Sequence, residues 1–436
     1  MSELPPLVRL AIPLAMQQVG FQLMGVVDAA MLGRYSDAAL AGAGVGNNLL
    51  FGIVSIGLGI IMGMDTVVPQ ALGGGRLDDA RRAVGAGVRL AVLVGLVATL
   101  VVFATPLILD LADVQPEVIA QARPYLYLRA VGVVPFLITV ALRSYLAANG
   151  KTRPMIIAVT AGNVANALLD VVLIFGVSAI GLPALGVLGA AIATTIVQLI
   201  ILAVYALGVR ALDRGQPRPP STTADLVAIA RYGGPVGGQI FAEVGIFGVA
   251  TVIAAHLGKL PAAAHAIALN ISSLTFSFAV GVASATSVRV GLAVGAGDLA
   301  TARKRGILGV QLGLGVMACF AAAFVLAPAA IASAFTDRAE VIAATVPLLQ
   351  IAAVFQLSDG TQAVGAGALR GLGRTGATLW ANLVGHYVVG LPIILALGFT
   401  AGLGIAGVWW GLSAGLAVTA LYLVWTFLRS TSRSPR

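Results

Sequence analysis

The sequence predicts an all-α polytopic membrane protein of about twelve transmembrane helices, built as two homologous six-helix lobes. Composition, recurring apolar windows and an internal repeat together predict this fold class. Apolar residues make up 59% of the 436 residues and charged residues 10%, against roughly 45–50% and about 25% in soluble domains. A soluble fold of this length could not bury so much apolar surface, so we expect lipid to surround the chain.

Apolar windows of about 20 residues, the length that crosses a bilayer, recur along the whole chain. Short polar stretches separate them. Several windows are longer than the bilayer is thick, which predicts tilted or bent helices. The twelve predicted spans are residues 8–33, 40–70, 84–111, 122–147, 154–178, 185–210, 226–257, 262–292, 304–330, 341–369, 376–398 and 403–428.

The basic residues sort onto alternate loops. With twelve spans, all but five of the 26 Lys and Arg residues lie on one side of the membrane. The positive-inside rule makes that side cytoplasmic and places both termini there. The net charge of +9 therefore indicates the inner face of a membrane, and we expect no nucleic-acid partner. The five exceptions are Arg34, Arg123, Arg129, Lys259 and Arg338.

The two halves of the chain resemble each other at a constant offset. Pro13 and Gln17 recur as Pro235 and Gln239, and 239 − 17 = 222. Because six spans are an even number, the two repeats have the same orientation, as in many secondary transporters whose substrate site lies between the repeats. A Pro-rich polar segment separates the halves. The predicted organisation is an N-terminal lobe at 1–210, a cytoplasmic linker at 211–224 and a C-terminal lobe at 225–436.

Two motifs resemble nucleotide-binding signatures without their context. Gly371–Gly376 matches G-x-G-x-x-G, but it follows no predicted strand, and chance matches are expected with 54 glycines. Gly150-Lys151-Thr152 resembles the end of a Walker A loop, yet Tyr145 stands where the first glycine would be. Neither indicates a phosphate site. Small residues four positions apart, such as Gly59 and Gly63, predict close helix packing in lipid.

Four carboxylates lie well inside predicted spans: Asp28, Asp170, Glu243 and Asp359. A charged side chain at mid-bilayer costs about 2.5–3.5 kcal/mol, so such groups usually face a cavity and carry function. In the repeat, each acid has an apolar counterpart, which argues against a structural ion pair that both halves need. The counterparts, in the same order, are Ala250, Ile393, Phe21 and Phe136.

Amide and hydroxyl groups accompany the acids along the same helix faces. Asn163, Asn166 and Asp170 are spaced i, i+3 and i+7 on the fifth span, and Thr194 on the sixth span offers a further oxygen. Gln239 lies one turn before Glu243 on the seventh. Carboxylates with such oxygens suit a hard cation or a proton.

Several stretches resemble the multidrug and toxic compound extrusion (MATE) family, particularly its NorM-like branch. These stretches are Val27-Asp28, GQIFAEVGIF at Gly238–Phe247, AHAIALNISSLTF at Ala264–Phe276 and QLSDGTQAVGAGALRGLGRT at Gln356–Thr375. The resemblance covers nearly the whole chain. It implies a twelve-helix antiporter with two six-helix lobes around a V-shaped cavity, which expels organic, often cationic, compounds in exchange for Na⁺ or H⁺.

The resemblance also assigns candidate site residues. In the C-terminal lobe it implies that Glu243 and Asp359 are the cation-site acids, with Gln239 and Phe355 beside them. Some members have a tyrosine at the position of Phe355, so a hydroxyl ligand is lost here, which favours protons over Na⁺ in this lobe. In the N-terminal lobe it implies a polar cluster. That cluster comprises Asp28, Asn166 and Asp170, and the candidate Na⁺ sites are these three residues or Glu243 with Asp359. Asn163 and Thr194 join the N-terminal candidate site from the helix faces described above.

From this resemblance we expect small organic drug-like substrates, membrane lipids as surroundings, no cofactor beyond the coupling ion, and a monomer. We expect a multi-pass protein of the plasma membrane, the inner membrane in bacteria. Two alternatives stay open: a flippase for a lipid-linked precursor, which would need a cavity rich in Arg or Lys, and an intramembrane enzyme, for which no nucleophile and base stand out. His386 on the eleventh span is either a packing residue or a proton relay.

Overall fold

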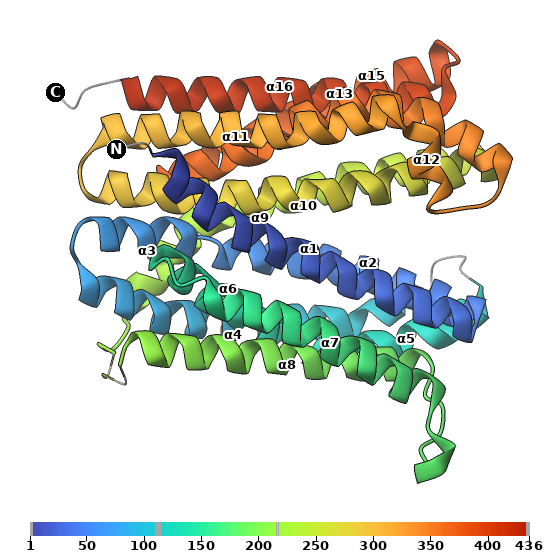
Figure 1. The fold of residues 1–436 in the computed structure, drawn as a ribbon, viewed down its shortest axis with the longest axis horizontal. Coiled ribbons are helices and arrows are strands. Elements are labelled where there is room, and N and C mark those ends of the chain that lie inside the picture. Colours follow the sequence, from blue (N-terminus) through green and yellow to red (C-terminus); the bar gives the residue numbers. More distant parts are fainter. Residues whose placement is uncertain (1–2, 110–114, 215, 217, 433–436) are drawn as a thin grey trace. The chain divides into compact units, whose positions relative to one another are not determined.

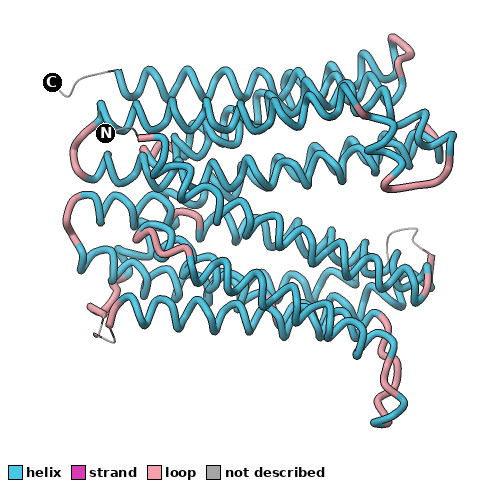
Figure 2. The backbone as a smooth tube through the Cα atoms, viewed as in Figure 1, coloured by secondary structure: helices cyan, strands magenta, loops and turns pink. Residues whose placement is uncertain are grey.

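The computed structural model describes residues 3–109, 115–214, 216 and 218–432. Throughout these ranges the chain is helical and contains no β-strand, only one isolated bridge between Val177 and Leu182 (Figure 2). The all-α fold class predicted from the sequence is therefore confirmed. The last predicted cytoplasmic residues, 433–436, and the tip of the loop at 110–114 lie outside the described residues.

The first half of the chain contains eight α-helices and one short 3₁₀ turn (Figure 1). They are α1 Leu4–Tyr35, α2 Asp37–Ile61, α3 Met64–Gly73, α4 Leu77–Leu109, α5 Pro116–Val131, α6 Val133–Ala148, α7 Arg153–Phe175, η1 Ser178–Ile180 and α8 Val187–Leu212.

The second half contains the remaining helices, two of which are π-helical. They are α9 Thr223–His256, α10 Lys259–Gly295, α11 Leu299–Leu326, α12 Pro328–Ser333, α13 Ala339–Gly371, α14 Thr375–Asn382, η2 Leu383–Gly390, α15 Leu391–Leu395, η3 Ala396–Thr400 and α16 Gly404–Ser432.

Among the described residues, 11 helical stretches are long and apolar enough to cross a membrane. The pair α5 and α6, bent by 45° at Gly132, makes up to 12 when it is counted as one span. Pro135 lies in the first turn of α6, and a proline there cannot continue the hydrogen bonding of the preceding helix. The predicted number of spans is thus confirmed, and the fourth of them is a broken helix.

The eleventh span widens into π-helix because a neighbouring helix reaches into it. Gly385 in η2 leaves no room for a side chain, since an added methyl group would overlap the hydroxyl of Thr419 on α16. That hydroxyl donates a hydrogen bond to the carbonyl of Ala381 at 3.2 Å. An inserted side chain of this kind is a recognised cause of a π-bulge.

The chain divides into two compact units. The N-unit consists of residues 19–68 and 76–237, and the C-unit consists of residues 1–18, 69–75 and 238–436. The first half of α1 therefore belongs to the C-unit, and the first half of α9 belongs to the N-unit. The predicted lobe limits at 210 and 225 stay a prediction.

Within the N-unit, α2 and the first half of α9 cross at glycines. An added methyl group on Gly59 would overlap the backbone of Gly237, and one on Gly63 would overlap the backbone of Ile229 and Gly233. Such small residues let two backbones approach in a lipid environment, where packing and not hydrophobic burial drives helix association. The packing role predicted for Gly59 and Gly63 is confirmed.

The C-unit repeats this crossing with its own residues. An added methyl group on Gly281 of α10 would overlap the backbone of Ala15 in the first half of α1. The pair matches the N-unit crossing at the offset found in the sequence, since 281 − 59 = 222 and 237 − 15 = 222. The internal repeat therefore extends from sequence to helix packing.

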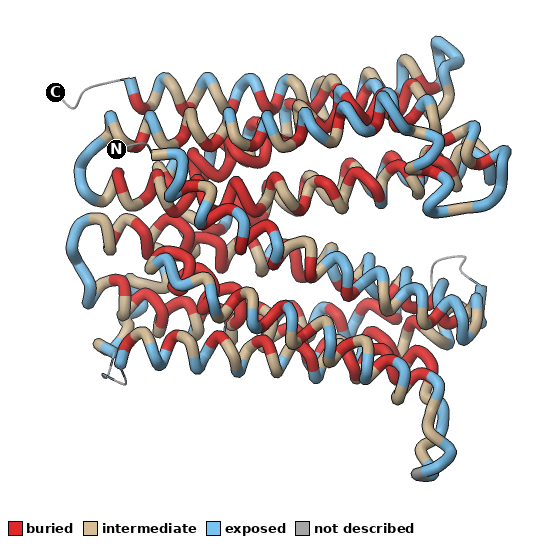
Figure 3. The backbone as a smooth tube through the Cα atoms, viewed as in Figure 1, coloured by how far each residue is buried: buried red, intermediate tan, exposed pale blue. Residues whose placement is uncertain are grey.

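Buried residues line the faces where helices meet within each unit, and exposed residues follow the outer faces (Figure 3). Many of the exposed residues are large and apolar: Leu100 is 69% exposed and Leu207 is 66% exposed. Exposed apolar patches of this extent are absent from soluble monomers. These outer faces are therefore the surfaces that contact lipid.

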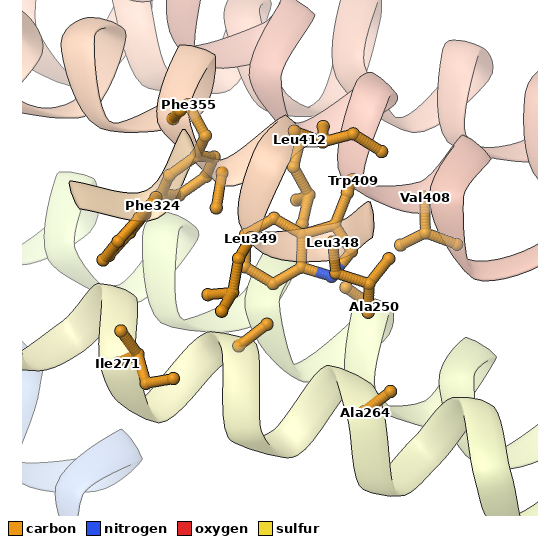
Figure 4. Packing of buried hydrophobic residues seen from close by; sticks show 14 of the residues in the cluster. Ala250, Ala264, Ile271, Phe324, Leu348, Leu349, Phe355, Val408, Trp409 and Leu412 are labelled. Carbon is orange, nitrogen blue, oxygen red and sulfur yellow. The ribbon is translucent and has the colours of Figure 1, made fainter. Parts of the chain in front are cut away.

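The largest buried side chain of the C-unit is Trp409 on α16. Its ring packs edge-on against Phe355, with ring centroids 5.5 Å apart, and Leu348, Leu349 and Leu412 lie around it (Figure 4). This apolar cluster fixes α13 against α16. The polar residues of α13 lie on the neighbouring turns of that helix.

The N-terminal end of α1 is fastened to the C-unit by an ion-pair cluster. Arg305 donates from Nε to Glu3 Oε2 at 2.9 Å, and Arg289 bonds the same oxygen. Arg305 also donates to the carbonyl of Arg289 at 3.0 Å. The hydrogen bond from Arg305 and the two positive charges hold the pKa of Glu3 below its ordinary value of 4.5.

Gly59→Ala should lower the midpoint of thermal unfolding in detergent micelles, because its methyl group meets rigid backbone; overpacking of this kind costs about 1–3 kcal/mol. Gly44→Ala on the same helix is the control, since nothing lies within 4 Å of its added methyl group. Helix propensity alone should leave that control unchanged or stabilise it by up to about 1 kcal/mol. Equal effects of the two variants would contradict the crossing.

Glu3→Gln should lower the unfolding midpoint at pH 7. Since the folded-state pKa of Glu3 is depressed, its ion pairs contribute fully above pH 4.5 and are lost as the pH falls below that value. The difference between wild type and variant should therefore shrink in acid. Glu340→Gln is the control, because the Arg338–Glu340 pair is 60–70% exposed and such pairs contribute little. A difference that persists at pH 3 would contradict this assignment.

Candidate functional site

Three helices of the N-unit bring polar groups to Asp28. Asn166 on α7 donates from Nδ2 to Asp28 Oδ1 at 2.9 Å. Thr194 on α8 donates to Asp28 Oδ2 at 3.0 Å while also bonding the carbonyl of Ala190. Each oxygen of this half-buried carboxylate thus has one donor. The sequence predicted that these three residues belong together, and the structure brings them into contact.

Asp170 completes the cluster from one turn further along α7. It is fully buried, and neither carboxylate oxygen has a hydrogen-bond partner among the described residues. It lies close enough to Asp28 for their charges to interact, and Asn166 Oδ1 beside it also has no partner. Two acids this close, away from water, require a proton or a cation between or beside them.

Asn163 has a different role in the structure. Its amide donates to the carbonyl of Gly20 at 3.1 Å and to that of Val159 at 2.8 Å. It therefore fastens α7 to α1 near the acids and donates to neither of them. An added methyl group on Gly20 would overlap Val159, so the two helices touch at this level.

Tyr125 was not among the residues that the sequence singled out. It is buried on α5, and its phenol lies within electrostatic range of Asp28, Asp170 and Arg129. Tyr125 lies in a long apolar window, so no row of polar residues on one helix face marked it. The only available signal was Arg129, which lies one turn further along the same helix.

The C-unit site joins α9, α13 and α14. Gln362 on α13 donates to Glu243 Oε2 at 3.4 Å and contacts Asn382 Oδ1 at the same distance, so both hydrogen bonds are long. Asp359, one turn earlier on α13, is almost completely buried and lies within electrostatic range of Glu243. The two predicted acids of this half are therefore neighbours.

The amide of Gln239 also lies against Glu243. Gln239 is buried, and its Oε1 has no hydrogen-bond partner in the described part of the chain. Gln362 Oε1 likewise has no hydrogen-bond partner among the described residues. Two carbonyl-type oxygens and two carboxylates therefore share this region, which gives it oxygen ligands suited to a small cation.

Phe355 belongs to the apolar wall of this site. It is 2% exposed, and its ring packs against Trp409 and, with centroids 6.0 Å apart, against Phe247 (Figure 4). It lies one turn before Asp359 and contributes no oxygen. Phe355 packs against other aromatic rings, which agrees with the prediction that this position supplies no hydroxyl ligand.

Asn382 and Tyr387 are polar residues of this site that the sequence did not single out. Asn382 accepts from Gln362, and Tyr387 donates to the carbonyl of Ala242, next to Glu243, at 2.8 Å. Asn382 is the last residue of α14, and Tyr387 lies in the π-helix η2 that follows, whose wider turn shifts which residues share a face. A regular 3.6-residue period cannot reveal that shift.

His386 lies in the same π-helix and is fully buried. Neither ring nitrogen has a hydrogen-bond partner among the described residues, and the ring lies 6.5 Å from that of Phe247. Its environment is apolar on the side of Phe247. Packing and proton relay both remain open for it.

Within the described residues, no group of three or more His, Cys, Asp or Glu side chains could hold a metal ion. Each site instead combines two carboxylates with neutral oxygens.

Two repeats of membrane-spanning helices, each with its own pair of buried acids, define a polytopic membrane transporter of the parallel-repeat type. A sequence model of the MatE family matches this chain twice, at residues 13–172 and 235–395. The chain belongs to this family, and it is a transporter and not an enzyme. The two matches begin 235 − 13 = 222 positions apart, which is the offset of the internal repeat.

Individual relatives agree with the family. The chain is 36% identical to a probable multidrug resistance protein NorM of Pseudomonas putida, over 98% of this chain and 94% of that protein. It is also 36% identical to a protein of the same name from Deinococcus radiodurans, over 99% and 96%. A crystal structure of a eukaryotic MATE transporter matches with a TM-score of 0.87 and 19% identity, over 98% of this chain and 97% of that one.

Thr194→Val should reduce the free energy of unfolding by about 1–3 kcal/mol, because one oxygen of the half-buried Asp28 loses its donor. Thr195→Val is the matched control: its hydroxyl bonds only the carbonyl of Ala191 in its own helix. Thermal unfolding of both purified variants in micelles measures the difference. Equal midpoints would mean that the hydroxyl of Thr194 does not support the acid.

Proposed function

We propose that this protein is a multidrug efflux antiporter, which expels small organic and mostly cationic compounds in exchange for H⁺ or Na⁺. The observation that carries the proposal is the pair of half-buried Asp28 and fully buried Asp170, whose charges have too few partners unless a cation or proton joins them. The names of the relatives, multidrug resistance protein NorM, support the substrate class.

The proposed mechanism is competition for the same acids during alternating access. A proton or Na⁺ that arrives from outside neutralises the acids and weakens their hold on a cationic compound, which leaves outward. When the ion leaves inward, the recharged acids attract the next compound. A ligand shifts such an equilibrium only through different affinities for the two states, and neutralisation of charge supplies that difference.

Protons are the better-supported coupling ion for the C-unit. Phe355 packs in the apolar cluster and offers no hydroxyl, and the hydrogen bonds of Gln362 are long, so few well-placed oxygens surround Glu243. The N-unit is the better candidate for Na⁺, because Asn166 and Thr194 there lie 2.9 Å and 3.0 Å from the carboxylate of Asp28, beside the oxygens of Asp170. In this mechanism either ion would itself be carried across the membrane.

The orientation follows from the basic residues. We place both termini and the segment between α8 and α9 on the cytoplasmic side of the plasma membrane, the inner membrane in bacteria, as the positive-inside rule requires. We further propose that the protein acts as a monomer. A lipid-precursor flippase is less well supported, since a pyrophosphate group would need several deep Arg or Lys side chains, whereas the two sites are acidic.

Asp28→Asn, Asp170→Asn, Glu243→Gln and Asp359→Asn should each reduce export of a fluorescent organic cation from proteoliposomes by at least about tenfold, because each removes a buried counter-charge. A pH gradient and a Na⁺ gradient are imposed separately. The gradient that drives export in wild type identifies the coupling ion.

Asp37→Asn is the control, because this acid is exposed at the start of α2 and should leave export unchanged. Thermal unfolding of each variant establishes that it is folded. If all four neutralised variants export at the wild-type rate, the acids do not couple the ion to the drug. If no gradient drives export of any cation but a lipid-linked precursor moves, the flippase alternative holds.

A further inference from the structure

A cavity of about 670 Å³ lies within the N-unit, away from Asp28 and Asp170, at the end where α8 leads into the following segment. This volume is in the range of about 300–1,000 Å³ that holds drug-sized molecules. Helices α4, α6 and α8 form its wall, with α6 packed between the other two. The apolar lining comprises Val88, Ile138, Leu142, Leu202, Ala206 and Val209.

The apolar lining is continuous with a lipid-facing surface. Ala206 is exposed at the edge of the cavity, and its neighbour Leu207 is among the most exposed apolar residues of the N-unit. A hydrocarbon chain from the surrounding bilayer can therefore enter along α8.

The mouth of the cavity is polar and carries net positive charge. Arg210 and Arg218 line it together with one acid, Asp213. Arg218 donates from Nε to Asp213 Oδ2 at 2.9 Å, so these two charges balance. Arg210 is exposed, and no ion-pair partner for it is found among the described residues. One cationic side chain thus remains to receive an anion.

The mouth is also a fixed structure. Asp213 is buried, and the phenol of Tyr145 on α6 donates to its Oδ1 at 2.8 Å. Arg81 on α4 lies 3.8 Å from the same oxygen and donates to Gln216 Oε1 at 2.9 Å. These contacts hold Asp213 and Gln216 against α4 and α6, at the mouth of the cavity.

We propose that this cavity binds one anionic phospholipid, with an acyl chain along α6 and the phosphate of the headgroup beside Arg210. An apolar slot that opens toward lipid and ends at an uncompensated arginine matches a molecule with the same two parts. A zwitterionic lipid would place its own cation against Arg210, and a free phosphate would leave the apolar wall empty. The proposal does not depend on the direction of transport or on the coupling ion.

Native mass spectrometry of the purified full-length protein tests this, with phosphatidylglycerol and phosphatidylcholine that have the same acyl chains. Wild type should retain one phosphatidylglycerol at least about fivefold more tightly than phosphatidylcholine, which corresponds to about 1 kcal/mol for a basic residue at the headgroup. Arg210→Gln should abolish this preference. Ala206→Trp should reduce retention of both lipids, because the indole fills the slot.

Two controls match these variants. Lys151→Gln removes an exposed charge next to α7 and should keep the preference, and Leu207→Trp adds an indole on the outward face beside the slot and should keep retention. Equal loss in Arg210→Gln and Lys151→Gln would reduce the effect to diffuse attraction and overturn the proposal. It would also be overturned if wild type does not discriminate between the lipids, if inorganic phosphate displaces the lipid, or if Ala206→Trp binds like wild type. Drug export by wild type stays a separate measurement, so failure here leaves the proposed function untouched.

Discussion

The cost of a carboxylate at membrane depth is the constraint on which the rest of this structure depends. In hydrocarbon a charge has no water to solvate it, so each acid must find donors, a counter-ion or a proton inside the protein. Asp28 obtains two donors from two helices, whereas the oxygens of Asp170 obtain none. The partial satisfaction of this pair supports the proposed binding role, since in a purely structural network every polar group would be paired.

The scaffold around the acids is built by a different rule. Its helices are joined by close backbone approaches that recur in both halves, as at Gly59 with Gly237 and at Gly281 with Ala15. Each contact needs only the absence of a side chain, so it survives duplication without change. The acids do not recur, because each half provides a different set of oxygens. Repetition thus produced the helix framework, and divergence of individual side chains produced the sites.

From hydropathy and the repeat, the sequence predicted the number of spans and the four acids. The grouping of Asp28 with Asn166 came from the family resemblance, and Thr194 was a candidate oxygen on the next span. The sequence missed Tyr125, Asn382 and Tyr387, which reach the sites from apolar windows. Asn382 and Tyr387 border or belong to a π-helix that an inserted threonine creates, and such a defect arises from a contact between helices distant in sequence. The periodicity of a sequence describes one helix at a time, so it cannot reveal a defect that a contact between two helices causes.

The two acid pairs also differ in the residues that surround them, and this difference bears on which ion each pair can hold. The N-unit pair sits among an asparagine, a threonine and a tyrosine from three helices, so it has neutral oxygens for a cation that needs several ligands. The C-unit pair adjoins the packed cluster of Phe355, Phe247 and Trp409, which supplies no oxygen on that side of the acids. In the proposed competition for shared acids, this difference would set which pair a small ion occupies first.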